Sequence, residues 1–180
     1  MTVTSPVKRV QGRPRQFSDD VVFMATAEAV ATYGYRGLTM AAVANLVGCT
    51  GPALIHRYGS KQGLLLGYLD WSIARSNDLF ERVRRDLPSP LTAIRARFAD
   101  PHHRHTNDDA AHLSHVIFFV EGRTDRAFIP QMERYAGALT SGTERLVAEA
   151  IELGELRPVP ADELARVIVA GVIGASLMWS

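Results

Sequence analysis

The sequence has very little cysteine: Cys49 is the single one among 180 residues. One cysteine excludes an intramolecular disulfide and a zinc site built from cysteines alone, and this usage fits a reducing compartment. Long hydrophobic runs are also missing, since the longest, Val167 to Trp179, is too short to span a bilayer comfortably. No secretory signal pattern occurs before residue 30. We therefore predict a soluble cytoplasmic protein without a membrane partner.

Motifs of several enzyme classes are absent as well. The sequence contains neither a Gly-rich loop that could hold phosphates nor a Gly-x-Ser-x-Gly nucleophile elbow. Five of the six histidines lie between His102 and His115, but their spacing matches no metalloprotease motif and no general base is paired with them. We expect no enzymatic activity and no cofactor.

The chain has almost no net charge, because 20 basic and 19 acidic side chains leave a formal net charge of only +1. Its distribution is nevertheless uneven. Residues 1–61 carry seven basic and three acidic side chains, whereas the remainder carries thirteen basic and sixteen acidic ones. This asymmetry indicates that the N-terminal third meets a polyanion and that the acidic body has another role.

Apolar residues recur with helical spacing along the chain, and no segment alternates with period two for long enough to form a strand. We predict helices over 18–33, between a cap at Thr39 and an end at Gly48, for two turns from Thr50, and from Ser60 to the break at Pro88. Further helices are expected over 91–99, 109–122, about 127–153, and from about 162 onward. The fold class is therefore all-α.

Only Gly48 and Cys49 separate the second and third helices, so the chain must turn sharply between them, as in a helix-turn-helix. The predicted domains are a flexible basic tail (1–16), a helix-turn-helix DNA-binding domain (17–61) and a helical body (62–180), whose effector-binding and dimerisation role is implied by the family resemblance described below.

The third helix is too short to bury much, so we predict that it presents side chains to the DNA major groove. Thr50 and the free N–H groups of the first turn suit a phosphate, and the small residues Gly51, Pro52 and Ala53 allow close approach to base edges. The side chains predicted to follow the DNA backbone at the end of this helix are His56, Arg57 and Lys61.

The basic tail contains Gly12-Arg13-Pro14-Arg15, a segment of the kind that enters the minor groove of A·T-rich DNA. We predict minor-groove contacts by Arg13 and Arg15; the alternative is a solvated chain end.

The stretch "YGYRGLT" followed by "TMAAVANLVGCTGPALIHRYGSKQGLL" resembles the DNA-binding domain of the TetR family of bacterial transcriptional regulators over residues 17–65. The resemblance implies a phosphate-contacting cap at Thr39, a recognition helix from Thr50 to Arg57, a core aromatic at Tyr58 and a phosphate-binding lysine at Lys61. Two positions depart from the family pattern. Gly51 replaces a commonly basic or polar residue, and Ile55 replaces a phosphate-binding tyrosine. Leu54, Ile55 and Tyr58 are interpreted as core residues.

The remainder resembles the family's helical ligand-binding and dimerisation domain, which implies a homodimer that binds a palindromic double-stranded DNA operator. The final helix is apolar nearly all round and contains small residues that allow close helix packing. The predicted dimer interface consists of Leu139, Leu146, Val147, Ile168, Gly171, Val172 and Ala175. Related chains usually continue beyond the position of Ser180, so we expect a truncation there.

A small, mostly apolar effector is expected to bind among the helices between the DNA-binding domain and the dimer interface. The candidate residues are Trp71, Phe98, His112, His115, Phe118, Phe119, Phe128 and Tyr135. Plain core packing is the alternative for the aromatic ones. The implied function is a transcriptional repressor that its effector releases from DNA.

Two further alternatives remain open at this point. His102, His105, His112 and His115 could bind a metal ion, which would make the protein a metal-sensing regulator. The body could instead only dimerise, which would give a DNA-binding protein without an effector.

Overall fold

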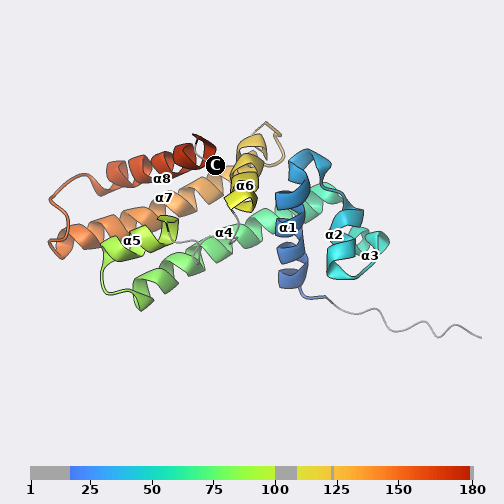
Figure 1. Ribbon diagram of the computed structural model, residues 1–180, viewed down its shortest axis with the longest axis horizontal. Coiled ribbons are helices and arrows are strands. Elements are labelled where there is room, and N and C mark those ends of the chain that lie inside the picture. Colours follow the sequence, from blue (N-terminus) through green and yellow to red (C-terminus); the bar gives the residue numbers. More distant parts are fainter. Residues whose placement is uncertain (1–16, 100–108, 123, 179–180) are drawn as a thin grey trace, which may run out of the picture.

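The computed structural model describes residues 17–99, 109–122 and 124–178. This part of the chain forms helices only, which confirms the predicted fold class. The helices are α1 (Asp19–Gly37), α2 (Met40–Val47), α3 (Gly51–Tyr58), α4 (Lys61–Asp86), α5 (Pro90–Ala99), α6 (Asp109–Gly122), α7 (Ile129–Glu152) and α8 (Ala161–Met178). In Figure 1, α1–α3 form one end of the molecule, called the head below, and α4–α8 form the body, with α6 beside α1.

Local hydrogen bonds fix the boundaries of the first helices where the sequence predicts them. The side-chain oxygens of Ser18, Thr39, Thr50 and Ser60 each accept a hydrogen bond from the main-chain N–H three residues further on. Gly48 ends α2 in the left-handed conformation, with φ 75°. At Gly34, φ is 65° and ψ is 179°, so regular helix stops there as predicted, although a further turn continues to Gly37.

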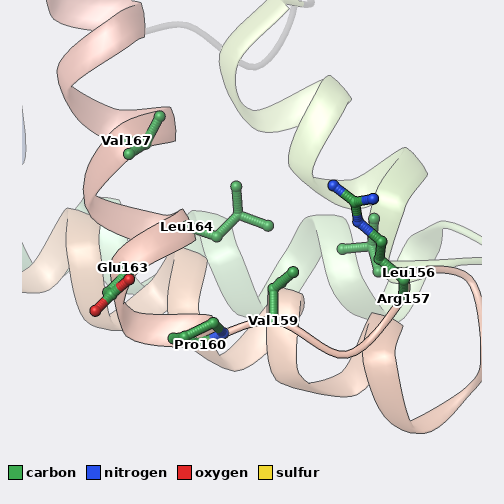
Figure 2. Close-up of a pocket in the computed structure, with 7 residues that line it drawn as sticks. All are labelled: Leu156, Arg157, Val159, Pro160, Glu163, Leu164 and Val167. Atoms are coloured by element: carbon green, nitrogen blue, oxygen red, sulfur yellow. The ribbon is translucent and has the colours of Figure 1, made fainter.

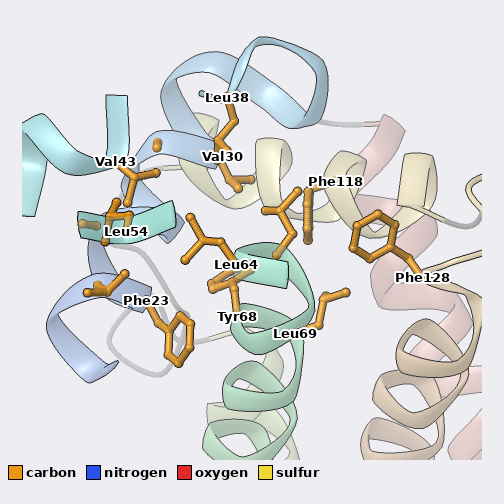
Figure 3. Packing of buried hydrophobic residues seen from close by; sticks show 14 of the residues in the cluster. Phe23, Val30, Leu38, Val43, Leu54, Leu64, Tyr68, Leu69, Phe118 and Phe128 are labelled. Atoms are coloured by element: carbon orange, nitrogen blue, oxygen red, sulfur yellow. The ribbon is translucent and has the colours of Figure 1, made fainter. Parts of the chain in front are cut away.

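One apolar core joins the head to the body. It contains Val22, Phe23 and Val30 of α1, Val43 of α2, Leu54 of α3, and Leu64, Leu65, Tyr68 and Leu69 of α4. Phe118 of α6 and Phe128, just before α7, belong to the same cluster, as Figure 3 shows. The predicted domain division after residue 61 therefore falls inside a continuous core.

Tyr35, after the bend in α1, links the head to the connection between α6 and α7. Its ring centroid lies 5.8 Å from that of Phe118 and 5.8 Å from that of Phe128. Its hydroxyl donates a hydrogen bond to Oδ2 of Asp125 at 3.0 Å. Burial and this carboxylate raise the pKa of Tyr35, so the phenol stays protonated and remains a donor at neutral pH.

A second core lies in the body, between α4, α5, α7 and α8. Its buried members include Phe80, Val83, Ala93, Leu146 and Val169. Helices α4 and α7 approach closely at Gly142, where an added Cβ would lie 2.5 Å from the Phe80 ring. Ion pairs between α4 and α7 cover the same seam; they are Asp70–Arg134, Glu81–Arg145 and Arg84–Glu149.

None of the helices in the described part of the chain has the length and apolar character needed to cross a membrane.

The close approach at Gly142 predicts a substitution cost. Gly142→Ala should lower the free energy of unfolding by about 1–3 kcal/mol, because the new methyl group displaces the Phe80 ring. Gly137 lies in the same helix, and an added Cβ there meets no atom within 4 Å. Gly137→Ala should therefore raise the free energy of unfolding by up to about 1 kcal/mol. Urea unfolding followed by circular dichroism measures both, and equal effects at the two positions would contradict this packing.

Candidate nucleic-acid interface and effector site

Helix α3 turns one side to the core and the other to solvent. Leu54 is 2% exposed, as predicted, whereas Ile55 is 49% exposed, which corrects the prediction that it is core. Successive helical residues are rotated by about 100°, so Ile55 cannot share the inner side that Leu54 and Tyr58 occupy. Pro52, Ala53 and His56 are exposed as well. These three and Ile55 form the outer face of α3.

Arg57 and Tyr58 fasten the end of α3 to the start of α1. Nη2 of Arg57 lies 2.8 Å from Oδ1 of Asp19, and its Nη1 donates to the main-chain oxygen of Phe17. The Tyr58 hydroxyl donates to the same Asp19 oxygen at 2.5 Å, and its ring lies 5.7 Å from that of Phe23. Burial and the Asp19 carboxylate raise the pKa of Tyr58, which keeps the phenol protonated. Tyr58 is thus packed against the core as expected, while Arg57 has an internal partner.

Lys61, the first residue of α4, is directed toward the end of α1. Its Nζ donates to the main-chain oxygen of Tyr35 at 3.0 Å and lies 3.4 Å from that of Arg36. A cation is favourable there because the last carbonyls of a helix lack intrahelical partners. Partial burial lowers the pKa of Lys61. Phosphate binding by Lys61 stays a prediction, and the ammonium has a second role as a cap of α1.

Thr39 and Thr50 are exposed at the starts of α2 and α3. Each oxygen accepts a main-chain hydrogen bond, so each hydroxyl proton can still be donated to a phosphate. Gly51 has open space where a Cβ would lie, so packing does not require glycine at this position. Arg13 and Arg15 lie outside the described residues.

The predicted effector residues fall into two groups. Trp71 packs on Phe23, with ring centroids 6.0 Å apart, and its Nε1 donates to Oδ1 of Asp20 at 2.8 Å. Trp71, Phe118 and Phe128 thus belong to the core shared with the head. The other group lies in the second core, where Phe98 packs on Phe80 near Tyr135. Phe119 lies between the two groups, because it packs against the shared core and stacks on Tyr135 with centroids 4.1 Å apart.

Arg97 of α5 lies within this second group, and the sequence analysis does not single it out. The side chain is only 6% exposed. Its Nη2 donates to Oγ of Ser76 at 3.1 Å, and it is hydrogen-bonded to Tyr135. A sequence signal exists, because Arg97 stands four residues after the fully buried Ala93 and so shares its helix face.

The histidine cluster stays a sequence-based prediction. His102 and His105 lie outside the described residues, and α6 is described only by its backbone at His112 and His115. Among the side chains that are described, no three His, Cys, Asp or Glu residues could hold a metal ion together.

A groove of about 450 Å³ lies at the turn from α7 to α8 (Figure 2). Val159, Pro160 and Leu164 provide apolar lining, and Arg157 and Glu163 flank them. None of the predicted effector residues lines this groove.

Burial corrects part of the predicted dimer interface. Leu139, Leu146 and Val147 are 7%, 4% and 0% exposed, because α4, α5 and α8 of the same chain pack around α7. On α8, Ile168 and Val172 are half-buried, whereas Gly171 and Ala175 are exposed. Gly171, Ala175, Val167 and Met178 follow one another at helical spacing, and we call them the outer face of α8. Val167 and Met178 are 67% and 74% exposed, so this face is apolar and open to solvent.

The head matches a known family. Residues 23–68 match the family model described as "Bacterial regulatory proteins, tetR family". The match begins in α1, includes α2 and α3, and ends in α4. No curated protein sequence matches the chain significantly.

Solved structures share the fold over most of the chain. FadR from Bacillus subtilis in complex with stearoyl-CoA has a TM-score of 0.71 at 12% identity, covering 90% of this chain and 87% of that one. A TetR transcription regulator from Haloarcula marismortui ATCC 43049 has a TM-score of 0.68 at 20% identity, with 88% and 83% covered.

AibR in complex with isovaleryl coenzyme A and operator DNA has a TM-score of 0.58 at 21% identity, and the alignment covers 90% and 87% of the two chains. These likenesses establish the fold of the body as well as that of the head. Residues 23–68 thus match the helix-turn-helix domain of the TetR family of bacterial transcriptional regulators, and the chain shares its all-helical fold with these solved structures.

Proposed function

We propose that this protein is a homodimeric repressor that binds a palindromic operator through α3 and leaves the DNA when a small, mostly apolar effector binds the body. The observation that carries the proposal is the outer face of α3. Apart from Ile55, its exposed residues are small or hydrogen-bonding, and Leu54, Arg57 and Tyr58 hold the helix from behind. A short helix fixed in this way can enter a major groove without losing its own packing.

Phosphate contacts would come from the exposed ends of two helices. Thr39 and Thr50 have hydroxyl protons to donate, and the N–H groups of Met40 and Ala41 in α2 and of Gly51 in α3 precede the first intrahelical hydrogen bonds. His56 adds a side-chain donor on the outer face of α3. Arg57 and Lys61 contribute mainly by positioning α3 and α4.

The dimer would form through the outer face of α8. This face is apolar and exposed, and its small residues Gly171 and Ala175 allow another helix to approach closely. Two heads in one dimer would reach half-sites about 34–36 Å apart, one turn of the DNA helix. A small change in the angle between head and body would therefore break the register.

The effector signal would reach the head through α6. Phe119 stacks on Tyr135 of α7, the rings of Phe118 and Phe119 are 5.4 Å apart, and Phe118 contacts Tyr35. An effector that displaces α6 would move Tyr35, whose carbonyl accepts from Lys61 at the start of α4. Release requires that the effector favour the state with the wrong spacing. Acyl-CoA ligands in the FadR and AibR structures support an effector-responsive body in this fold.

Ala53→Glu tests the DNA-binding face without weakening the fold. Glutamate at this position completes a capping box with Thr50, so the melting temperature should stay equal or rise. Its negative charge would face DNA phosphates and should weaken binding by about 100-fold. The matched control is Ala53→Gln, which forms the same capping box without the charge and should bind more tightly than Ala53→Glu.

The measurement is fluorescence anisotropy on the DNA upstream of the protein's own gene, with random DNA for comparison and a salt series. Repressor function requires sequence-specific, salt-sensitive binding by the wild type. Equal binding by wild type and Ala53→Glu would show that α3 does not meet DNA. Absence of specific binding by the wild type would contradict repression of its own gene.

Tyr35→Phe tests the connection between head and body. The change removes the hydrogen bond to Asp125 but keeps the ring between Phe118 and Phe128. Coupling is reciprocal, so DNA bound to the wild-type head should alter hydrogen exchange over residues 124–135, and Tyr35→Phe should reduce that change. Tyr33→Phe is the control, because Tyr33 is 53% exposed on the same helix. An unchanged DNA effect in Tyr35→Phe would exclude this hydrogen bond from the coupling.

A further inference from the structure

Arg97 is a cation in the interior of the body. Its guanidinium carbon lies 4.9 Å from the Phe80 ring centroid and 5.1 Å from that of Phe98. Ser76 and Tyr135 are its hydrogen-bond partners, so α4, α5 and α7 all surround it. It is buried to the same degree as the apolar core residues Phe23 and Val169.

The charge of Arg97 has no carboxylate partner among the described residues. Three less buried arginines of the body differ in this respect, since Arg84, Arg134 and Arg145 each pair with an acidic side chain. The Nε of Arg97 is buried and has no acceptor among the residues that the structure describes. Desolvation lowers the pKa of Arg97, but a guanidinium in a protein remains protonated at neutral pH. A positive charge therefore persists in the core without a carboxylate beside it in the described part of the chain.

Core packing does not explain this arginine. A buried charge is costly unless it is paired and fully hydrogen-bonded, and an apolar side chain of similar length would fill the space between Phe80 and Phe98 without that cost. The two rings and the two hydroxyls stabilise the guanidinium only in part. Among the described residues, no acceptor satisfies the Nε of Arg97, so this donor is available to a negatively charged ligand.

We infer that Arg97 binds the carboxylate of the effector, and that the effector class is a small organic carboxylate with an aromatic or aliphatic body. The planar N–H fork of arginine matches the two oxygens of a carboxylate, and Nε supplies a donor that is still free. Phe80 and Phe98 are the apolar side chains beside the guanidinium, and Phe119 lies beyond Tyr135, so the remainder of the ligand would meet an apolar environment. This inference rests on the proposed effector-responsive function and specifies its ligand.

The position of Arg97 also fits the route to the head. Tyr135 is hydrogen-bonded to Arg97 and stacks on Phe119 of α6. A carboxylate bound at Nε would compete for the guanidinium and displace Tyr135, and the stacked Phe119 would follow. Ligand charge would thus act on α6, which contacts Tyr35 of the head through Phe118.

The test compares carboxylates with their uncharged amides on the full chain. The probes are straight-chain fatty acids from acetate to laurate, benzoate and phenylacetate, each paired with its primary amide. The readout is the melting temperature, which rises only with a ligand that prefers the native state. Wild type should be stabilised by at least one carboxylate and not by the corresponding amide.

Three variants separate a binding role from a structural one. Arg97→Met should bind that carboxylate about 10- to 100-fold more weakly, as expected for loss of charge-assisted hydrogen bonds. Without ligand, Arg97→Met should melt at the wild-type temperature or higher, because an unpaired buried charge is removed. Arg97→Lys keeps the charge without the planar fork and should bind at an intermediate level. Arg95→Met, at an exposed position of the same helix, should behave as wild type.

Three results would overturn the inference. Arg97→Met that melts well below wild type without ligand would show that the guanidinium is a structural part of the core. The inference also fails if no carboxylate raises the melting temperature of wild type more than its amide does. It fails as well if the carboxylate stabilises Arg97→Met as much as wild type, because Arg97 would then not bind the ligand's charge.

DNA binding by the same variants shows whether a negative result contradicts the carboxylate inference alone or the repressor proposal as well. If wild type and Arg97→Met bind operator DNA equally while no carboxylate acts, the inference fails and the repressor proposal stands. If wild type binds no specific DNA, the repressor proposal fails whatever the carboxylates do.

Discussion

Helix α1 buries its apolar side against α6 of the body as well as against α2 and α4, and the position of the head depends on this contact. Val22, Phe23 and Val30 share one core with Phe118 and Phe128, so neither part of the molecule can close its interior without the other. Tyr35 adds a hydrogen bond to the same junction. If an effector displaced α6, a junction packed in this way would carry the displacement to the head, whereas a flexible linker would absorb it.

Several charged residues of the head stabilise the arrangement of its own helices. Asp19 binds both Arg57 and Tyr58, and Lys61 donates to the last carbonyls of α1. These contacts fix α3 relative to α1 and α4, which matters because base edges are read only by a helix held at a defined angle. The exposed outer face of α3 is left small and largely apolar. Specific binding would then depend more on fit and on main-chain donors than on a high density of positive charge.

The body combines ordinary core packing with a buried charge. Close contacts such as Gly142 on Phe80 pack α4 against α7, and surface ion pairs cover that seam. Arg97 breaks the pattern, since it carries a charge into the same region. Proteins that bind ligands in their interior commonly retain such polar groups because specificity requires them.

The sequence by itself determined the helices, their limits and the type of head. Caps at Ser18, Thr39, Thr50 and Ser60 and the glycine ends at Gly34 and Gly48 act through hydrogen bonds and backbone conformations a few residues apart, so they could be predicted from the local sequence. The helix-turn-helix was predictable for the same reason, because the spacing of short-range signals defines it.

Only the tertiary structure decided which side of each helix is covered and by what. Ile55 is exposed, and Leu139, Leu146 and Val147 are enclosed by their own chain, although all four are equally apolar in sequence. Lys61 reaches α1, and Arg97 lies between helices that are distant along the chain. These outcomes depend on contacts between residues 20 or more positions apart. Hydrophobic periodicity predicts which side of a helix is apolar, but it does not predict which other helix covers that side.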